Sequence, residues 1–325
     1  MTKFRYSLLF AFFVTPCFSA SFHGTFNVTN SCPAYTSIKK QLNPGDITLK
    51  PGESYPIDQV NNTKNPQWYA IHLQGMTDNN ERWVNKDCGN IVTNPPCNNQ
   101  PGLADSYLLS LGWQATFCSS SKYHQSKQEC QPGFRVDKNY QFTLHGLWPN
   151  QKACGKHYGH CNNSISPEAQ FCDYVMFEIE QKHLDTLNRQ MPGANTKDCL
   201  DRHEWYKHGS CQFMSAGDYF STAANFTQEI NNSSFGQYIR NNIGKTIKRK
   251  TLLKKFEQSF GKDSTKKIYI GCYNNYLMSL NITLPVITKD NARQSLSSLI
   301  QQAPNSPHEN DCSKQLTIMA PPNGA

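Results

Sequence analysis

Four ionisable side chains near the middle of the chain follow a spacing that brings them to one face of a helix. They are His203, Glu204, Lys207 and His208. At about 100° per residue, all four fall within roughly 140° of arc around a helix axis. Two imidazoles beside a carboxylate and an ammonium can transfer protons and hold an anionic group. This segment therefore predicts an acid–base site with built-in positive charge.

A glycine directly after this group marks the expected end of the helix. Gly209 follows His208, and glycine readily takes the left-handed conformation that ends a last helical turn. We therefore expect a helix over residues 197–208, with the ionisable group at its end and near a surface.

A third histidine follows a run of strand-forming residues. Residues 140–144 read Tyr-Gln-Phe-Thr-Leu, and a glycine and then Trp148-Pro149 come after His145. β-formers that run into Gly and Pro predict a strand that breaks at His145. An imidazole at such a strand end, on a sheet edge or cleft, is available to face the helix.

The two segments together resemble the active-site motifs of a known family. Segments 145–149 (His-Gly-Leu-Trp-Pro) and 203–211 (His-Glu-Trp-Tyr-Lys-His-Gly-Ser-Cys) are closely similar to the two active-site segments of the ribonuclease T2 family. The resemblance covers about residues 104–317 and leaves residues 20–103 outside. Two separated motifs with six reactive side chains make a coincidence improbable.

The resemblance implies an endoribonuclease that cleaves single-stranded RNA without a metal or other cofactor. His208 would be the general base for the ribose 2′-hydroxyl, and His145 the general acid for the leaving 5′-oxygen. Lys207 and Glu204 would contact the pentacovalent transition state, and His203 would hold the phosphate. The expected products are a 2′,3′-cyclic phosphate and then a 3′-phosphate. A bell-shaped pH profile follows because one histidine must be neutral while another is protonated.

Three residues are candidates for binding bases. By resemblance Trp148 stacks on a base beside the site, although a core aromatic side chain would fit the sequence equally well. Asn150 stands where the family often has an aspartate that contacts a base. This departure leaves the base preference open, and low base specificity is the expectation. Gln114 is a candidate for a second base, but burial or a strand-edge hydrogen bond would explain it as well.

Thirteen cysteines indicate an oxidising compartment. Without Cys17, which lies in the N-terminal segment, twelve remain, an even number that predicts as many as six disulfides. Spacing does not determine which cysteines pair. The resemblance implies two pairs, and two more are expected with them: Cys161 with Cys211 and Cys272 with Cys312, then Cys118 with Cys130 and Cys172 with Cys199.

The N-terminus predicts export. Residues 1–20 combine two basic residues, the apolar run from Leu8 to Val14 and small residues suited to cleavage, as in a removable signal peptide. This run is too short to span a bilayer, which takes about 20 residues. A lipid anchor on Cys17 is a weaker alternative because Pro16 precedes it. We expect a secreted protein, or one in a periplasm or an endolysosomal-type compartment.

Residues 21–325 are expected to form two folded parts joined by a linker. Short strand-like runs between turn residues make residues 21–93 a small all-β accessory module, and residues 68–84 resemble a bacterial SH3-like barrel with an unknown ligand. Residues 94–103 read as the linker. Residues 104–325 mix strands and helices without regular βαβ spacing, which predicts an α+β fold with an antiparallel sheet. In that part Ser166-Pro167 predicts the start of a helix to about Arg189.

A zinc site is the main alternative chemistry. Zinc proteases need a second histidine four residues after the first, and Lys207 occupies that position after His203. Segment 154–161 (Cys-x-x-His-x-x-His-Cys) is a tighter cluster, but its cysteines are expected in disulfides, which leaves its histidines on a surface loop. No metal site is therefore predicted, and chelator sensitivity would distinguish a zinc peptidase.

The net charge favours a polyanionic partner. A formal charge of +8 fits an RNA substrate, and nothing in the sequence indicates a membrane or an obligate protein partner. The rival interpretation is a catalytically inactive RNA-binding or storage relative of the fold. His145 and the four ionisable residues of the second motif are all present, which argues against this alternative. A relative that had lost its activity would no longer need them.

Overall fold

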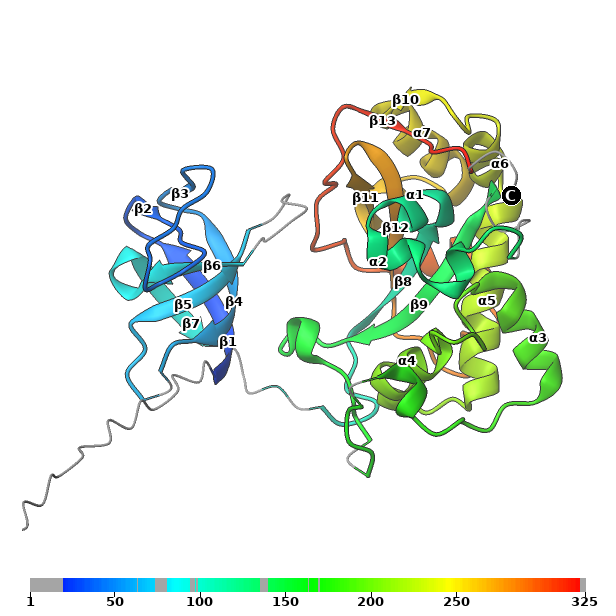
Figure 1. Ribbon diagram of the computed structural model, residues 1–325, viewed down its shortest axis with the longest axis horizontal. Coiled ribbons are helices and arrows are strands. Elements are labelled where there is room, and N and C mark those ends of the chain that lie inside the picture. The colour runs from blue at the N-terminus through cyan, green and yellow to red at the C-terminus, as the bar shows by residue number, and fades with distance from the viewer. Residues whose placement is uncertain are drawn as a thin grey trace, which may run out of the picture. The chain divides into compact units, whose positions relative to one another are not determined.

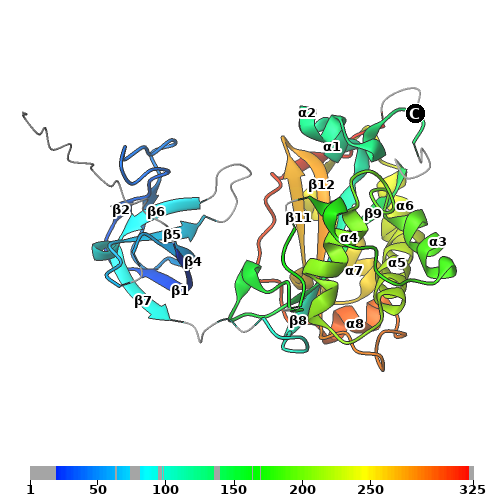
Figure 2. The same ribbon diagram turned by 60° about the horizontal axis from the view of Figure 1, so that its bottom comes forward.

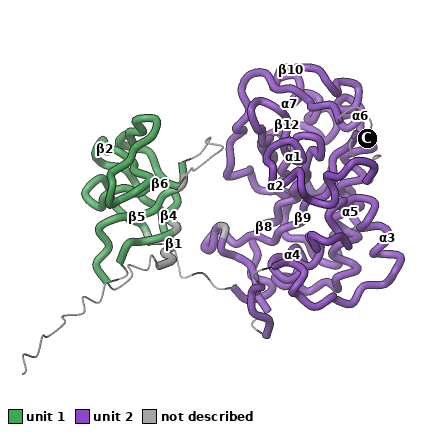
Figure 3. The backbone as a smooth tube through the Cα atoms, viewed as in Figure 1, with its two compact units in different colours: residues 1–73, 81–94 green, residues 74–80, 95–325 purple. Residues whose placement is uncertain are grey.

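The chain divides into two compact units. The computed structural model describes residues 20–62, 64–73, 81–93, 97, 99–134, 140–162, 164–168 and 170–321. One unit takes residues 20–73 and 81–93, and the other takes residues 97–321 (Figure 3). The expected export signal lies outside the described residues, apart from Ala20. No helix in the described ranges is long and apolar enough to cross a membrane.

The first unit is built from β-strands (Figure 1). The strands are β1 (Ala20–Val28), β2 (Cys32–Pro33), β3 (Thr48–Leu49), β4 (Ser54–Val60), β5 (Trp68–His72), β6 (Glu81–Asn85) and β7 (Gly89–Thr93). Five of them form an antiparallel sheet in the order β6-β5-β4-β1-β7, and β2 pairs with β3. Phe26, Ile57 and Ile71 are buried in its core, and a disulfide joins Cys32 to Cys88. The SH3-like assignment stays a prediction.

The second unit contains a six-stranded sheet. Its strands are β8 (Ser106–Trp113), β9 (Phe142–Asn150), β10 (Thr246–Lys248), β11 (Ile268–Tyr273), β12 (Tyr276–Leu284) and β13 (Gln315–Thr317). The order is β10-β13-β12-β8-β9, and β11 pairs with β12. All pairs are antiparallel except β12 with β13. Together with the helices of this unit, the sheet confirms the predicted α+β class.

Helices cover the sheet of the second unit (Figure 2). They are α1 (Gln114–Ser119), α2 (Lys122–Gln125), α3 (Gln181–Gln190), α4 (Leu200–Lys207), α5 (Ala216–Asn232), α6 (Ser234–Arg240), α7 (Arg249–Phe260) and α8 (Leu296–Gln302). One hydrophobic core joins sheet and helices, with buried side chains such as Leu109 and Trp113 from β8 and Phe226 from α5. Burial of this apolar surface is the main force that holds the helices on the sheet.

Helix α5 holds the edge strand β9 in place. Asn231 satisfies both backbone groups of Phe142, since its Oδ1 accepts the N–H at 3.0 Å and its Nδ2 donates to the carbonyl at 2.8 Å. The hydroxyl of Tyr219 donates to the carbonyl of Leu147. Side chains of α5 therefore replace a neighbouring strand along β9. This fixes the strand that carries His145.

The predicted helix from Ser166 to Arg189 is wrong over most of its length. Only residues 181–190 form α3, and residues 170–180 contain a short 3₁₀ helix, η5 (Phe171–Asp173), followed by extended backbone. A disulfide from Cys172 to Cys199 ties this segment to the start of α4. The local helix signal at Ser166-Pro167 could not take this long-range bond into account.

The end of the predicted linker is attached to the second unit. Cys97 forms a disulfide with Cys154. The backbone N–H of Gly102 donates to the carbonyl of Cys211 at 3.0 Å. Residues 94–96 and 98 lie outside the described part of the chain.

Candidate active site

Helix α4 carries the ionisable group of the second motif. It starts three residues later than predicted, because Cys199 takes a left-handed conformation with φ 47° before the first helical residue. At the other end the backbone N–H of His208 donates to the carbonyl of Glu204 at 3.1 Å. A 3₁₀ turn, η6 (Gly209–Cys211), follows, and a disulfide ties Cys211 to Cys161. The site therefore lies where α4 is fastened at both ends.

The predicted role of Gly209 is wrong. Gly209 does not take a left-handed conformation and opens η6 instead of ending α4. A Cβ at this position would lie 2.3 Å from Cε3 of Trp205. Glycine is needed here for close packing against an indole, a contact that a spacing argument does not reveal.

The strand predicted to break at His145 continues through it. β9 runs to Asn150, and its register with β8 shifts between the pairs Leu111–Leu144 and Ser110–Gly146. One residue, His145, is left over as a β-bulge. A bulge re-aims a side chain without ending the strand, and half of the His145 side chain, 51%, is exposed.

Gly146 allows β9 to approach α4 closely. A Cβ on Gly146 would lie 2.2 Å from Oε2 of Glu204 and 2.2 Å from Nε1 of Trp148. Any side chain here would therefore separate the two motifs. The glycine of the first motif is a requirement of the contact between strand and helix.

Glu204 forms the centre of the site. It is 1% exposed, accepts a hydrogen bond from Nε1 of Trp148 at 2.6 Å, and has Oε1 3.7 Å from Nε2 of His145. Burial raises the pKa of Glu204 to about 8, against the opposing effects of the Trp148 hydrogen bond and Lys207. Glu204 is therefore protonated at acid and neutral pH.

Aromatic contacts set the positions of the imidazoles. The rings of Trp148 and His208 stack with centroids 5.1 Å apart and planes at 26°. His145 meets the same indole edge-on at 5.3 Å and 80°. His203 and His208 lie 6.3 Å apart at 85°. Two histidines from different segments thus contact one tryptophan, and His203 contacts one of these two, His208.

Burial and Lys207 disfavour the charged forms of these imidazoles. Burial first, and then the charge of Lys207, lowers the pKa of His203 to about 4 and that of His208 well below its ordinary value. The same two causes lower the pKa of His145, although solvent at its half-exposed ring screens the effect. Glu204 does not offset these effects, because its raised pKa of about 8 leaves it uncharged at acid and neutral pH.

His160 lies beside the ionisable side chains of the second motif, although the sequence analysis placed it on a surface loop. It takes a left-handed conformation with φ 52°, and its backbone N–H donates to the carbonyl of Lys207 at 2.8 Å. Its charge contributes to the lowered pKa values of His203 and His208. Its neighbour Cys161 was the available signal, since that cysteine was expected to pair with the second motif.

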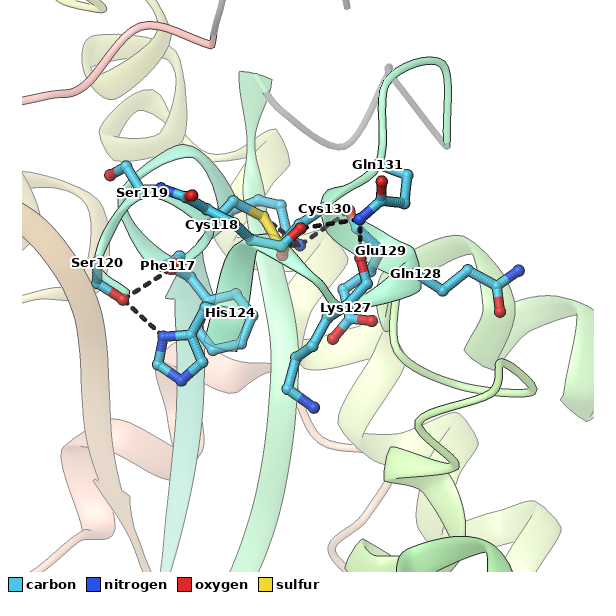
Figure 4. The surroundings of a disulfide bond; sticks show 12 residues. Phe117, Cys118, Ser119, Ser120, His124, Lys127, Gln128, Glu129, Cys130 and Gln131 are labelled. Carbon is cyan, nitrogen blue, oxygen red and sulfur yellow. Dashed lines mark hydrogen bonds between the residues drawn. A yellow bond between two sulfur atoms is a disulfide. The ribbon is translucent and has the colours of Figure 1, made fainter. Parts of the chain in front are cut away.

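The structure brings Trp148 to the site but buries Gln114 elsewhere. Gln114 is 6% exposed, and its Nε2 donates to the carbonyl of Glu129. Glu129 directly precedes Cys130 of the Cys118–Cys130 disulfide (Figure 4). This burial matches the structural explanation of Gln114 that the sequence also allowed. Asn150 ends β9, and its carbonyl accepts the N–H of Asp105 at 2.9 Å.

The twelve described cysteines all form disulfides. Four of the pairs are those expected from the sequence, and the other two were not anticipated: Cys118–Cys130, Cys161–Cys211, Cys172–Cys199 and Cys272–Cys312, then Cys32–Cys88 and Cys97–Cys154. Both cysteines of segment 154–161 are therefore unavailable as metal ligands.

Three side chains of the site could surround a cation by geometry alone. His203, Glu204 and His208 each offer a ligand atom, and these atoms lie within 4.8 Å of one another. Lys207 already disfavours positive charge on both histidines, and a divalent ion would meet the same repulsion. Two imidazoles and a carboxylate are ligands that zinc accepts, so the charge of Lys207 is what argues against a zinc ion here.

Comparisons with known proteins agree with the two motifs. The chain is 30% identical to Ribonuclease I of Escherichia coli (strain K12) over 239 residues, 67% of this chain and 87% of that protein. It is 28% identical to intracellular ribonuclease LX of Solanum lycopersicum over 132 residues, 39% of this chain and 49% of that protein. A solved structure, the SF11-RNase of Nicotiana alata, matches with a TM-score of 0.44 and 20% identity, covering 64% of this chain and 95% of that one. The model of the Ribonuclease T2 family matches residues 104–302. Since this match spans more than half of the sequence, the chain belongs to the ribonuclease T2 family.

Proposed function

We propose that this ribonuclease cleaves single-stranded RNA by metal-independent transphosphorylation, with His208 as general base and His145 as general acid. One observation carries the proposal: both imidazoles contact the same indole, that of Trp148, with centroids at 5.1 and 5.3 Å. Because the two rings come from different elements and differ in exposure, they can hold different protonation states around one phosphate.

The reaction balances with these two groups alone. His208 accepts the proton of the 2′-hydroxyl while the 2′-oxygen attacks phosphorus. The bond from phosphorus to the 5′-oxygen breaks, and His145 donates its proton to that oxygen. The product is a 2′,3′-cyclic phosphate. Water then opens the ring to a 3′-phosphate, with the two histidines in exchanged roles.

Lys207, His203 and Glu204 stabilise the phosphorane. Lys207 supplies a positive charge beside the imidazoles, and His203 holds the phosphate. The buried Glu204, protonated below about pH 8, donates a hydrogen bond from the oxygen that does not accept from Trp148. A neutral acid at this position avoids repulsion of the anionic phosphate.

Low base specificity follows from the groups near the site. One face of Trp148 is stacked on His208, which leaves at most one face for a base, and stacking discriminates weakly between bases. Asn150 offers an amide with both a donor and an acceptor. Neither group selects one base edge over all others.

The disulfides support an exported protein. Six disulfides among the described residues need an oxidising compartment to form and persist. We therefore place the mature enzyme outside the cytosol, after removal of the N-terminal signal.

The direct test uses the disulfide-intact protein, single-stranded RNA and EDTA from acid to neutral pH, with a His145→Ala variant alongside. We expect 2′,3′-cyclic phosphate ends from the wild type and almost none from the variant. RNA binding without cleavage at every pH would favour the inactive RNA-binding relative. Cleavage only after zinc is added would contradict the proposed mechanism.

A further inference from the structure

A phenylalanine outside both motifs covers His203. The rings of Phe171 and His203 stack with centroids 3.9 Å apart and planes at 23°. Phe171 belongs to η5, the segment that the sequence had assigned to a long helix. In the described part of the chain, no side-chain hydrogen bond orients the imidazole of His203. Stacking on Phe171 is therefore a contact that can set the plane of this ring.

Three separate ties hold Phe171 in this position. Its neighbour Cys172 is bonded to Cys199, directly before α4. The guanidinium of Arg202 donates to the carbonyls of Cys172 and Tyr174, both at 2.9 Å. The ring of Tyr174 stacks on Tyr206 with centroids 4.7 Å apart. In each of these three contacts, residue 172 or 174 is joined to residue 199, 202 or 206. The segment that carries Phe171 is therefore fixed against α4.

We infer that Phe171 is a positioning residue for His203, held on α4 by the Cys172–Cys199 disulfide. The inference rests on the proposed function, in which His203 holds the phosphate of the substrate. A ring that stacks on Phe171 and meets His208 at 85° presents its nitrogens in one direction. Without the Phe171 ring the imidazole of His203 would sample several rotamers. Substrate binding would then have to order this side chain, which lowers the affinity for the substrate.

The kinetic test compares Phe171→Leu with the wild type on a dinucleotide substrate. We expect KM to rise about five- to tenfold and kcat to change less than about threefold. Phe171→Tyr, which keeps a stacking ring, should restore the wild-type KM. Phe117→Leu is the matched control, because it removes a similar stack, on His124 with centroids 4.3 Å apart, outside the site. A KM rise in the control as large as in Phe171→Leu would overturn the inference.

A double-mutant cycle separates positioning from other roles. In a His203→Asn background, Phe171→Leu should raise KM no further, because the ring that it positions is gone. An equal rise in both backgrounds would mean that Phe171 acts on the substrate or on the fold directly, and would contradict the inference.

An NMR titration of His203 decides the point without RNA. Because burial lowers the pKa of this imidazole, loss of the Phe171 ring should raise that pKa toward its ordinary value. An unchanged resonance and titration curve in Phe171→Leu would overturn the positioning role. If the wild-type protein cleaved no RNA, the proposed function would fail while this titration still tested the inference.

Discussion

The indole Nε1 of Trp148 donates a hydrogen bond of 2.6 Å to the buried Oε2 of Glu204 and so joins the strand motif to the helix motif. Both residues also contact His145: the indole through its ring and the carboxyl group at 3.7 Å. The geometry of the site therefore depends on a donor that a base-stacking role for Trp148 would not require.

Replacing Trp148 with phenylalanine keeps an aromatic ring and removes this donor. We expect kcat/KM on RNA to fall by about 10- to 100-fold, and the free energy of unfolding to fall by about 1–3 kcal/mol, because a buried carboxyl oxygen loses its partner. Steady-state kinetics and urea unfolding measure both effects. A variant with wild-type stability and activity would show that the hydrogen bond has no role.

Gly146→Ala should disrupt the same contact from the strand side. The added Cβ would lie 2.2 Å from both Glu204 Oε2 and Trp148 Nε1, which forces β9 away from α4. We expect at least a hundredfold loss of kcat/KM, measured on protein shown to be folded by circular dichroism. Gly112→Ala in the neighbouring β8 is the control, since its Cβ would meet Thr143 Oγ1 at an ordinary 3.5 Å. Equal activity in the two variants would contradict this account.

Lys207→Met should move the pH profile as well as lower activity. Lys207 is the second cause, after burial, of the lowered pKa values of His145 and His208. Its removal favours the imidazolium form, so the basic limb of kcat/KM, where the general acid loses its proton, should shift upward by about half to one pH unit. Lys197→Met, at an exposed position, should leave the profile unchanged. A basic limb that stays in place or moves down would be inconsistent with this electrostatic role.

Glu129 should make stability depend on pH. Burial, followed by a hydrogen bond with Asp198, raises the pKa of Glu129 to about 7. The folded state then keeps a proton that the unfolded chain releases above its ordinary pKa of about 4.3. The contribution of this proton is fully present below pH 4 and is lost as the pH rises through 7.

The variant Glu129→Gln tests this dependence by thermal unfolding. It should match the wild type near pH 4 and exceed it at pH 8, by on the order of 1–3 kcal/mol. Glu168→Gln, at an exposed position, should follow the wild type at both pH values. A variant that is less stable than the wild type at pH 8 would show that the ionised carboxylate stabilises the fold.

Strand and helix patterns without regular βαβ spacing predicted the α+β class, and local spacing predicted the helix that carries the second motif. His203 and Lys207 lie close in the fold because four residues make about one helical turn, which needs no information from elsewhere in the chain. The apolar runs of β8 and β12 are likewise typical of buried strands. Structural features that depend only on neighbouring residues along the chain could therefore be predicted from the sequence.

Contacts between distant segments account for what the sequence did not reveal. The bulge at His145 depends on the register of β9 against β8, and the role of Gly209 depends on how Trp205 packs. Phe171 reaches His203 from a segment that a disulfide joins to the residue before α4. None of these contacts produces a periodic pattern in the sequence of the residues that form it.

The most direct test of the central claim is rescue of His145→Ala by an RNA substrate whose bridging 5′-oxygen at the scissile bond is replaced by sulfur. A thiolate leaves without protonation, so a missing general acid should no longer matter. We predict that His145→Ala cleaves this substrate at nearly the wild-type rate, whereas His208→Ala, which lacks the general base, remains inactive. Rescue of His208→Ala instead, or no rescue of either variant, would contradict the assignment of the two histidines.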